Sequence, residues 1–360
     1  MNSFLDLKKT VLYIHGRPSG HPIHNSYAKL INSDFCFSDY KLRWNDIENV
    51  SKIKRTLSWI ICAIMLPNQK SYDIFFSEGV REPLVIRKWF GLFRSNQKLI
   101  ALMANENLYF IYTNKYGRMV NFLMKSFLNN CDALICIGKY QTELANKLFP
   151  HTKTYTIFNG IPSTRMTLLQ NIKPDIESNK ILVIANCASI SRMYYKGLDL
   201  TFEVFNYCLK VDQNIELHIA GDCSDDVISF CEKIVNKKFQ HKIFFHGHSD
   251  ICNHLKNSGL LMQLGRGDSF PTSTIEAAAA GVPVFVSEET GTKELLQKID
   301  PYFITNLLAK DISCKIIEYL KIPNYEKNII SAKFKQVALT YTEENANSLF
   351  LKVFAEIGKD

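Results

Sequence analysis

Residues 265–294, GRGDSFPTSTIEAAAAGVPVFVSEETGTKE, combine a turn, a helix, a strand, a Gly turn and the start of a second helix. Asp268 and Glu276 stand eight positions apart, on either side of Pro271. The predicted helix opens with three hydroxyl residues, Thr272, Ser273 and Thr274. The first N–H groups of a helix lack intrahelical partners, and the helix dipole favours negative charge there. This helix start therefore suits a phosphate, and the flanking carboxylates suit hydroxyl groups on both sides of a diphosphate.

The helix start also allows a purely structural interpretation. Ser273 and Glu276 have the spacing of a capping box, in which each side chain bonds a backbone N–H of the other residue. Such a box would stabilise the helix without binding a ligand. The residues alone leave both interpretations open.

The whole stretch resembles the Glu-x7-Glu motif of the retaining family 4 glycosyltransferases, with Asp268 in place of the first Glu. The continuation AAAAGVPVFVSEETGTKEL over residues 277–295 follows the same family pattern. The resemblance implies that Asp268 contacts the donor sugar and Glu276 the nucleotide ribose. It also implies the α/β GT-B fold, with two Rossmann-like domains facing a central cleft and a C-terminal helix that crosses back.

The resemblance extends to the segment NCASISRMYYKGLDL, residues 186–200, which follows a predicted buried strand at residues 180–185. The family places an Arg and a Lys in this loop to neutralise the donor diphosphate. Lys196 before Gly197 matches this pattern, whereas Arg192 lies closer to the Lys than is usual. We expect both to act in catalysis together with Asp268. A solvated loop lysine is the alternative for Lys196.

Other candidate residues follow predicted strands, because the carboxyl ends of parallel strands form the ligand-binding edge of a sheet. The strand at residues 10–14 is followed by the loop HGRPSGH, which contains Gly16. The resemblance implies that Gly16 approaches the donor phosphate or the acceptor, and an ordinary strand-to-helix turn is the alternative. Near the nucleotide base, the resemblance places His246 and Gly247. Three further residues are candidates for the acceptor side, although turn formation would also explain them: Glu78, Asn105 and Glu106.

The length of 360 residues and a hydrophobic content of 46% predict two α/β domains with full cores. The resemblance implies an acceptor-side domain over residues 1–168, joined by a returning helix at 342–360. It implies a nucleotide-sugar-binding domain over residues 176–341. A polar, Pro-containing segment near residues 165–178 is the expected linker.

Charge is unevenly distributed along the chain. Residues 1–170 hold 22 Lys and Arg against 11 Asp and Glu, whereas residues 171–360 hold 21 against 24. The basic half favours an anionic partner. No recognition helix, RNP-like motif or zinc-finger spacing supports nucleic acid, so we expect no nucleic-acid partner. An anionic membrane surface is the expected alternative.

The segment at residues 52–70, KIKRTLSWIICAIMLPNQK, carries the membrane hypothesis. Its apolar run from Leu57 to Leu66 is too short to span a bilayer, which needs about 20 residues. The run suits either the membrane interface, with Trp59 at headgroup level, or a buried amphipathic helix. The sequence leaves both open.

Metal and cofactor sites are not expected. The ten cysteines show no paired CxxC spacing, which argues for reduced thiols rather than a zinc site or a disulfide framework. His15, His21 and His24 crowd one loop without an adjacent carboxylate. No DxD triplet suggests a divalent cation. The N-terminus has no apolar run of signal length, so we expect a cytoplasmic protein, with the inner face of the membrane as an option.

The resemblance implies a metal-independent retaining hexosyltransferase. The enzyme would move a hexose from a nucleoside diphosphate sugar to a glycan or lipid-linked acceptor in surface polysaccharide or glycoconjugate biosynthesis. An inverting enzyme would instead need a base, for which Glu78, Glu106 and His15 are available. Two alternatives remain: a nucleotide-sugar 2-epimerase of the same fold, and a non-catalytic subunit that binds a nucleotide sugar.

Overall fold

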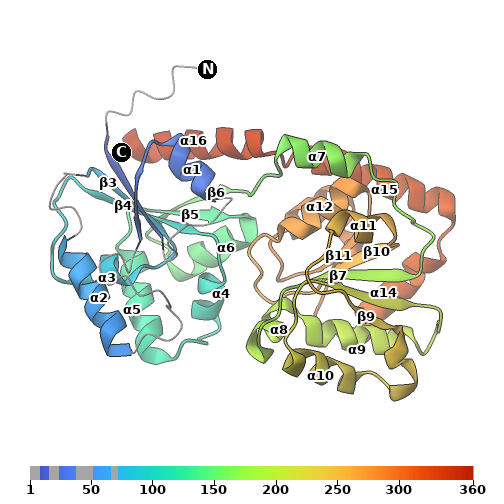
Figure 1. The fold of residues 1–360 in the computed structure, drawn as a ribbon. Coiled ribbons are helices and arrows are strands. Elements are labelled where there is room, and N and C mark those ends of the chain that lie inside the picture. The colour runs from blue at the N-terminus through green and yellow to red at the C-terminus, as the bar shows by residue number, and fades with distance from the viewer. Residues whose placement is uncertain (1–8, 16–23, 38–51, 66–71, 360) are drawn as a thin grey trace. The chain divides into compact units, whose positions relative to one another are not determined.

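A computed structural model describes residues 9–15, 24–37, 52–65 and 72–359 (Figure 1). The chain forms two compact units. Unit 1 comprises Met1–Phe158 and Ala346–Asp360, and unit 2 comprises Asn159–Asn345.

Unit 1 is built on a parallel sheet with the strand order β2-β1-β3-β4-β5-β6. The strands are β1 (Val11–His15), β2 (Asp34–Phe37), β3 (Ile74–Glu78), β4 (Lys98–Met103), β5 (Ala133–Ile137) and β6 (Lys153–Ile157). The helices are α1 (His24–Leu30), α2 (Lys52–Met65), α3 (Glu82–Trp89), α4 (Asn107–Tyr112), α5 (Arg118–Asn129), α6 (Lys139–Leu148) and α16 (Glu343–Lys359). Strands β1, β3 and β5 are buried along their whole length, as expected for a parallel sheet covered on both faces.

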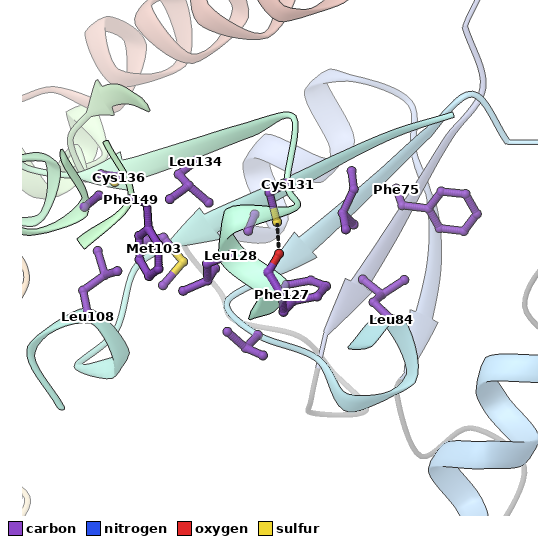
Figure 2. Packing of buried hydrophobic residues seen from close by; sticks show 14 of the residues in the cluster. Phe75, Leu84, Met103, Leu108, Phe127, Leu128, Cys131, Leu134, Cys136 and Phe149 are labelled. Atoms are coloured by element: carbon purple, nitrogen blue, oxygen red, sulfur yellow. Dashed lines mark hydrogen bonds between the residues drawn. The ribbon is translucent and has the colours of Figure 1, made fainter. Parts of the chain in front are cut away.

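The core of unit 1 lies between this sheet and the helices that follow its strands. Figure 2 shows Phe127 and Leu128 of α5 in one cluster with strand residues such as Phe75 and Met103. The thiol of Cys131 in this cluster donates to the Phe127 carbonyl at 3.5 Å (Figure 2). On the other face, Phe350 of α16 stacks on Tyr27 with ring centroids 4.6 Å apart.

Unit 2 repeats the architecture with the strand order β12-β11-β10-β7-β8-β9, all parallel. The strands are β7 (Lys180–Ile184), β8 (Glu216–Ala220), β9 (Ile243–Phe245), β10 (Leu260–Gln263), β11 (Val284–Ser287) and β12 (Ile304–Thr305). The helices are α7 (Ser163–Gln170), α8 (Ile190–Lys196), α9 (Leu198–Cys208), α10 (Asp225–Ile234), α11 (Ile251–Lys256), α12 (Thr272–Ala280), α13 (Lys293–Ile299), α14 (Ala309–Lys321) and α15 (Asn324–Ala338). Two 3₁₀ helices, η1 (Lys237–Lys242) and η2 (Pro301–Phe303), complete the unit.

Two sheets of parallel strands with intervening helices confirm the predicted α/β fold class. The units divide after Phe158, before the polar segment in which the sequence places a linker. Helix α7 starts in this interval and packs on α12, which accounts for its place in unit 2.

In each sheet the chain adds strands first on one side of a starting strand and then on the other, and the place where the side changes is called the switch point. In unit 1 the chain leaves β1 for β2 on one side and β3 on the other. In unit 2 it leaves β7 for β8 on one side and reaches β10 on the other. Ligands of open α/β sheets bind at the carboxyl ends of strands at such points. The candidate residues are therefore sought after β1 and β3, and after β7 and β10.

Candidate functional site

Lys196 and Asp268 meet at the switch point of unit 2. Lys196 ends α8, which follows β7, and Asp268 lies in the loop after β10. The Lys196 Nζ lies 2.7 Å from Asp268 Oδ2, and the two side chains are only 18% and 8% exposed. Gln263 Nε2 donates to the same carboxylate oxygen at 3.4 Å. The structure thus brings together two of the three residues predicted to be catalytic.

A glycine allows the two loops to approach closely. Gly197 has φ +69°, in the left-handed region, and a Cβ at this position would lie 1.8 Å from the Leu264 carbonyl oxygen. Only glycine avoids both the backbone strain and this overlap. The Arg266 amide N–H also donates to the Tyr195 carbonyl at 2.8 Å. The segment around Lys196 is therefore fixed directly against the loop that carries Asp268.

Arg266 is a structural residue of this site that the sequence did not reveal. Its guanidinium forms a bidentate pair with Asp199 of α9, at 2.8 and 3.0 Å, and also donates to the Tyr194 carbonyl at 2.7 Å. Bidentate Arg–carboxylate pairs are the geometrically specific kind of ion pair. Arg266 therefore links α9, α8 and the Asp268 loop. The Arg-Gly-Asp sequence gave no signal of this partner, because Asp199 lies 67 positions away.

The start of α12 lies four residues after Asp268. The helix begins at Thr272 with Pro271 as its N-cap, and no side chain caps it. The predicted alternative of a Ser273 capping box is therefore absent. Ser273 and Thr272 are half-buried, whereas the Thr274 side chain is fully buried. Of Thr274, only the backbone can therefore contribute to ligand binding at this helix end.

Glu276, one turn into α12, has a partner that the sequence did not predict. Its Oε1 accepts a hydrogen bond from Arg165 Nε of α7 at 2.9 Å. The same guanidinium donates to Cys252 Sγ at 3.0 Å. The hydrogen bond from Arg165 holds the half-buried Glu276 carboxylate in place and thereby orients its second oxygen.

Arg192 lies one turn before Lys196 on α8. Both cations lie by the Tyr195 ring, with Arg192 Cζ and Lys196 Nζ each 5.5 Å from its centroid. Arg192 is exposed, and the Ser189 side chain caps α8 by accepting from the Arg192 backbone N–H at 3.3 Å. The exposed guanidinium therefore lies by the Tyr195 ring, while its backbone starts the helix.

His246 belongs to a histidine cluster on β8, β9 and α11. Its Nε2 lies 2.9 Å from His218 Nδ1, and its ring centroid lies 4.4 Å from that of His254. Burial lowers the pKa of each of these three histidines below 6.5. Gly247 follows with φ +60°, which turns the chain after β9. The rings of His218 and His246 are stacked, with centroids 5.2 Å apart, whereas those of His246 and His254 are tilted by 46°.

Glu78 lies at the switch point of unit 1. Its carboxylate accepts from the Tyr13 hydroxyl and lies 2.8 Å from His24 Nδ1 and 3.4 Å from His15 Nε2. Burial raises the pKa of Glu78, but hydrogen bonds from His15, His24 and Tyr13 outweigh it, so the pKa lies well below its usual value. These four side chains, all buried, are called the Glu78 cluster. The sequence singled out Glu78 but not its partner Tyr13.

The other acceptor-side candidates follow β4. Asn105 Oδ1 accepts from the Asn107 backbone N–H at 3.1 Å, and Glu106 is the N-cap residue of α4. A Cβ on Gly79 would lie 3.1 Å from Asn105 Nδ2, so Asn105 lies beside the chain that follows Glu78. Gly16 lies outside the described residues. Within the parts of the chain that the structure describes, no group of three or more His, Cys, Asp and Glu side chains has the arrangement of a metal site.

The match to a known protein family lies in unit 2. Residues 174–336 match the family model of glycosyl transferases group 1. No curated protein sequence gave a match.

Solved structures match both units. A mutant of S. aureus TarM, in complex with fondaparinux, alpha-GlcNAc-glycerol and UDP, is 18% identical over 82% of this chain, with a TM-score of 0.59. This chain spans only 59% of that TarM chain. The E. coli structure described as trehalose-6-phosphate bound with UDP-2-fluoro glucose is 11% identical, covers 98% of this chain and 99% of its own, and has a TM-score of 0.70. Anabaena HepE, in complex with UDP and glucose, is 12% identical over 96% of this chain and 99% of its own, with a TM-score of 0.67. These likenesses confirm the predicted GT-B fold.

Proposed function

We propose that the protein transfers a hexose from a nucleoside diphosphate sugar to a glycan or lipid-linked acceptor, because residues 174–336 match the family model of glycosyl transferases group 1. One observation carries the proposal: Lys196 and Asp268 meet at the switch point of unit 2. Asp268 lies four residues before the uncapped start of α12. A cation and a helix N-terminus are the two features that bind a diphosphate. UDP complexes among the structurally similar proteins add support.

The proposed chemistry follows from charge. Breaking the bond between the sugar and the diphosphate leaves negative charge on the departing phosphate, and fixed positive groups lower that barrier. Lys196 and Arg192 supply cations beside the Tyr195 ring, and α12 supplies backbone N–H groups. Asp268 holds the Lys196 ammonium in place and is the expected contact for sugar hydroxyls.

Retention of configuration and independence from metal belong to the same proposal. In a retaining reaction the departing phosphate takes the acceptor proton on the same face of the sugar, so no separate protein base is needed. The cationic groups already in unit 2 supply the charge that a divalent ion would otherwise supply. The stereochemistry of the product and the rate with and without a chelator test these two points.

Membrane contact is a further part of the proposal. Helices α2 and α5, each packed on α3, carry exposed apolar residues. They are Ile53, Leu57, Ile64, Met119 and Phe122, between 51% and 81% exposed. Exposed basic residues accompany them: Lys54, Arg118 and Lys125. Apolar side chains among cations suit the surface of an anionic bilayer. Of the described helices, none is long and apolar enough to cross a membrane.

Sedimentation with lipid vesicles tests this contact. We expect binding to phosphatidylglycerol vesicles and little to phosphatidylcholine vesicles, and weaker binding after Phe122→Glu. Leu168→Glu, at an exposed apolar residue of unit 2, is the matched control. Equal binding to both lipids, or equal loss in both variants, would contradict the membrane part alone.

Incubation with labelled nucleotide sugars tests the enzymatic part. Transfer of label to an acceptor, or slow release of free sugar, is expected. Lys196→Ala should lower the rate about a hundredfold or more, by analogy with the loss of one preorganised donor to an oxyanion. Lys237→Ala, at an exposed lysine of η1, should leave the rate unchanged. Conversion of the donor sugar to its C2 epimer would instead identify the epimerase, and binding without turnover would identify a non-catalytic subunit.

A further inference from the structure

Two cysteines are paired at the carboxyl ends of β7 and β8. Cys187 follows β7, Cys223 follows β8, and the two residues form a parallel β-bridge. The Cys187 N–H donates to the Asp222 carbonyl at 2.8 Å, and the Ser224 N–H donates to the Cys187 carbonyl at 3.1 Å. Neighbouring strands lie about 4.8 Å apart. Disulfides need Cα atoms roughly 4.4–6.8 Å apart, so the backbone already has the required spacing.

The two cysteines differ in environment and reactivity, and the Cys223 thiol donates to the Ala185 carbonyl at 4.0 Å. The interaction between the neighbouring thiols lowers the pKa of Cys223 and raises the pKa of Cys187, and burial raises that of Cys187 further. Cys223 is half-buried, whereas the Cys187 side chain is fully buried. A thiol with a lowered pKa and access to solvent is the one that reacts first with an oxidant.

A third cysteine nearby has a different environment. Cys231 of α10 is fully buried, and its thiol donates to Met193 Sδ at 3.6 Å. Burial raises the pKa of Cys231 to about 12, which keeps it protonated and unreactive near neutral pH. Cys231 therefore serves as an internal comparison for the pair.

We propose that Cys187 and Cys223 form a reversible disulfide. The Cys223 thiolate attacks one sulfur of a small disulfide such as oxidised glutathione, which releases one glutathione thiolate. The Cys187 thiol then loses its proton and attacks Cys223 Sγ, which releases the second glutathione thiolate. The two protein thiols are oxidised, the glutathione disulfide is reduced to two thiols, and no other reactant is needed.

The proposed disulfide would constrain the segment that carries Lys196 of the candidate site. Ser189, two residues after Cys187, caps α8, and α8 ends at Lys196. A disulfide would fix the start of this segment to the residues after β8, so that α8 and Lys196 could adjust less to a bound ligand. On the proposed function, the oxidised protein should therefore bind UDP more weakly.

Peptide mapping after treatment with oxidised glutathione tests the proposal. We expect a cross-linked peptide pair containing Cys187 and Cys223, a loss of mass equal to two hydrogen atoms, and full reversal by dithiothreitol. Cys223→Ser should abolish the cross-link, and Cys231→Ser should leave it intact. Cys187→Ala should trap glutathione on Cys223, because the resolving thiol is missing.

Three outcomes would overturn the proposal: no reaction at Cys223, a stable glutathione adduct on Cys223 in the wild-type protein, or a cross-link that includes Cys231. UDP titration of the reduced and oxidised forms is a separate readout. Equal affinity in both forms would overturn the coupling to α8, whereas failure of both forms to bind UDP would contradict the proposed function and leave the covalent result standing.

Discussion

At the scale of single residues, Lys196 has two proposed roles that both use the N–H donors of its ammonium group: it pairs with Asp268, and it binds an anion. Its ammonium has three donors, and one is directed to Asp268 at 2.7 Å. Two donors therefore remain for a bound anion. The ion pair holds the ammonium in position before the ligand arrives, which is the preorganisation that electrostatic catalysis requires.

Glu78 is the residue whose neutralisation should cost unit 1 most. Glu78→Gln removes a buried carboxylate charge that accepts from the Tyr13 hydroxyl and lies beside His15 and His24, and hydrogen bonds to charged groups each contribute about 1.5–3 kcal/mol. The free energy of unfolding of unit 1 should fall by about 3 kcal/mol. Urea unfolding followed by tryptophan fluorescence measures it, because all three tryptophans lie within the first 89 residues.

The matched control for this substitution is Glu106→Gln, at a half-buried N-cap position. It removes the same charge outside the Glu78 cluster, and its cost should be below about 1 kcal/mol, as for most partly exposed polar substitutions. Equal costs at the two positions would show that the cluster contributes nothing specific to folding.

The histidine cluster predicts a loss of stability in unit 2 at acidic pH. Burial lowers the pKa of His218, His246 and His254 below 6.5, so the folded unit binds fewer protons than the unfolded chain. Stability is therefore complete above pH 6.5 and falls as the pH drops below it. Between pH 7.5 and pH 5.5, which lie about one unit on each side of 6.5, the melting temperature of His218→Gln should fall less than that of the wild-type protein. Calorimetry measures both.

His241→Gln changes an exposed histidine of η1 outside the cluster and serves as the control. Its melting temperature should follow the wild-type pH profile. If both variants show the wild-type decrease, the stacked histidines do not cause it.

At the scale of elements, the turn between α8 and α9 determines the site. Gly197→Ala should cost more than about 4 kcal/mol, because the new Cβ would lie 1.8 Å from the Leu264 carbonyl oxygen. Gly91→Ala has the same kind of positive φ, +62°, with nothing within 4 Å, and should cost only about 1–2 kcal/mol. Urea unfolding monitored by circular dichroism measures both. Similar costs would show that the close approach is unimportant.

The elements around the site could be predicted from local sequence to different degrees. Pro271 and the three hydroxyl residues after it predicted the start of α12 at Thr272, because proline is favoured where a helix begins. The family resemblance placed Lys196 and Asp268 in one site, whereas the ion pair between them was not predicted. Arg266–Asp199 and Arg165–Glu276 could not be predicted, since each joins residues more than 60 positions apart and neither forms a motif.

At the scale of the whole molecule, the alternation of strands and helices was sufficient to predict two parallel α/β sheets. Apolar runs followed by polar or Gly-containing turns mark the strands, and this signal is local. The Glu78 cluster was only partly predictable. The order of β1 and β3 in the sheet brings His15 next to Glu78, and strand order depends on tertiary packing rather than on local pattern.

The charge asymmetry also belongs to this scale. The excess of Lys and Arg lies in residues 1–170, whereas the residues that bind the proposed donor lie in unit 2. We therefore propose that the basic unit 1 has a partner other than the donor, and the exposed apolar residues of α2 and α5 favour an anionic membrane surface as that partner.

Calorimetric titration with UDP tests the central claim, that Lys196 and the start of α12 bind a diphosphate. The wild-type protein and Lys237→Ala should bind UDP equally and more tightly than uridine. Lys196→Ala should weaken UDP binding tenfold or more, which is about 1.4 kcal/mol, while its binding of uridine stays unchanged. Equal UDP affinity in Lys196→Ala and the wild-type protein, or uridine binding as tight as UDP binding, would contradict the account.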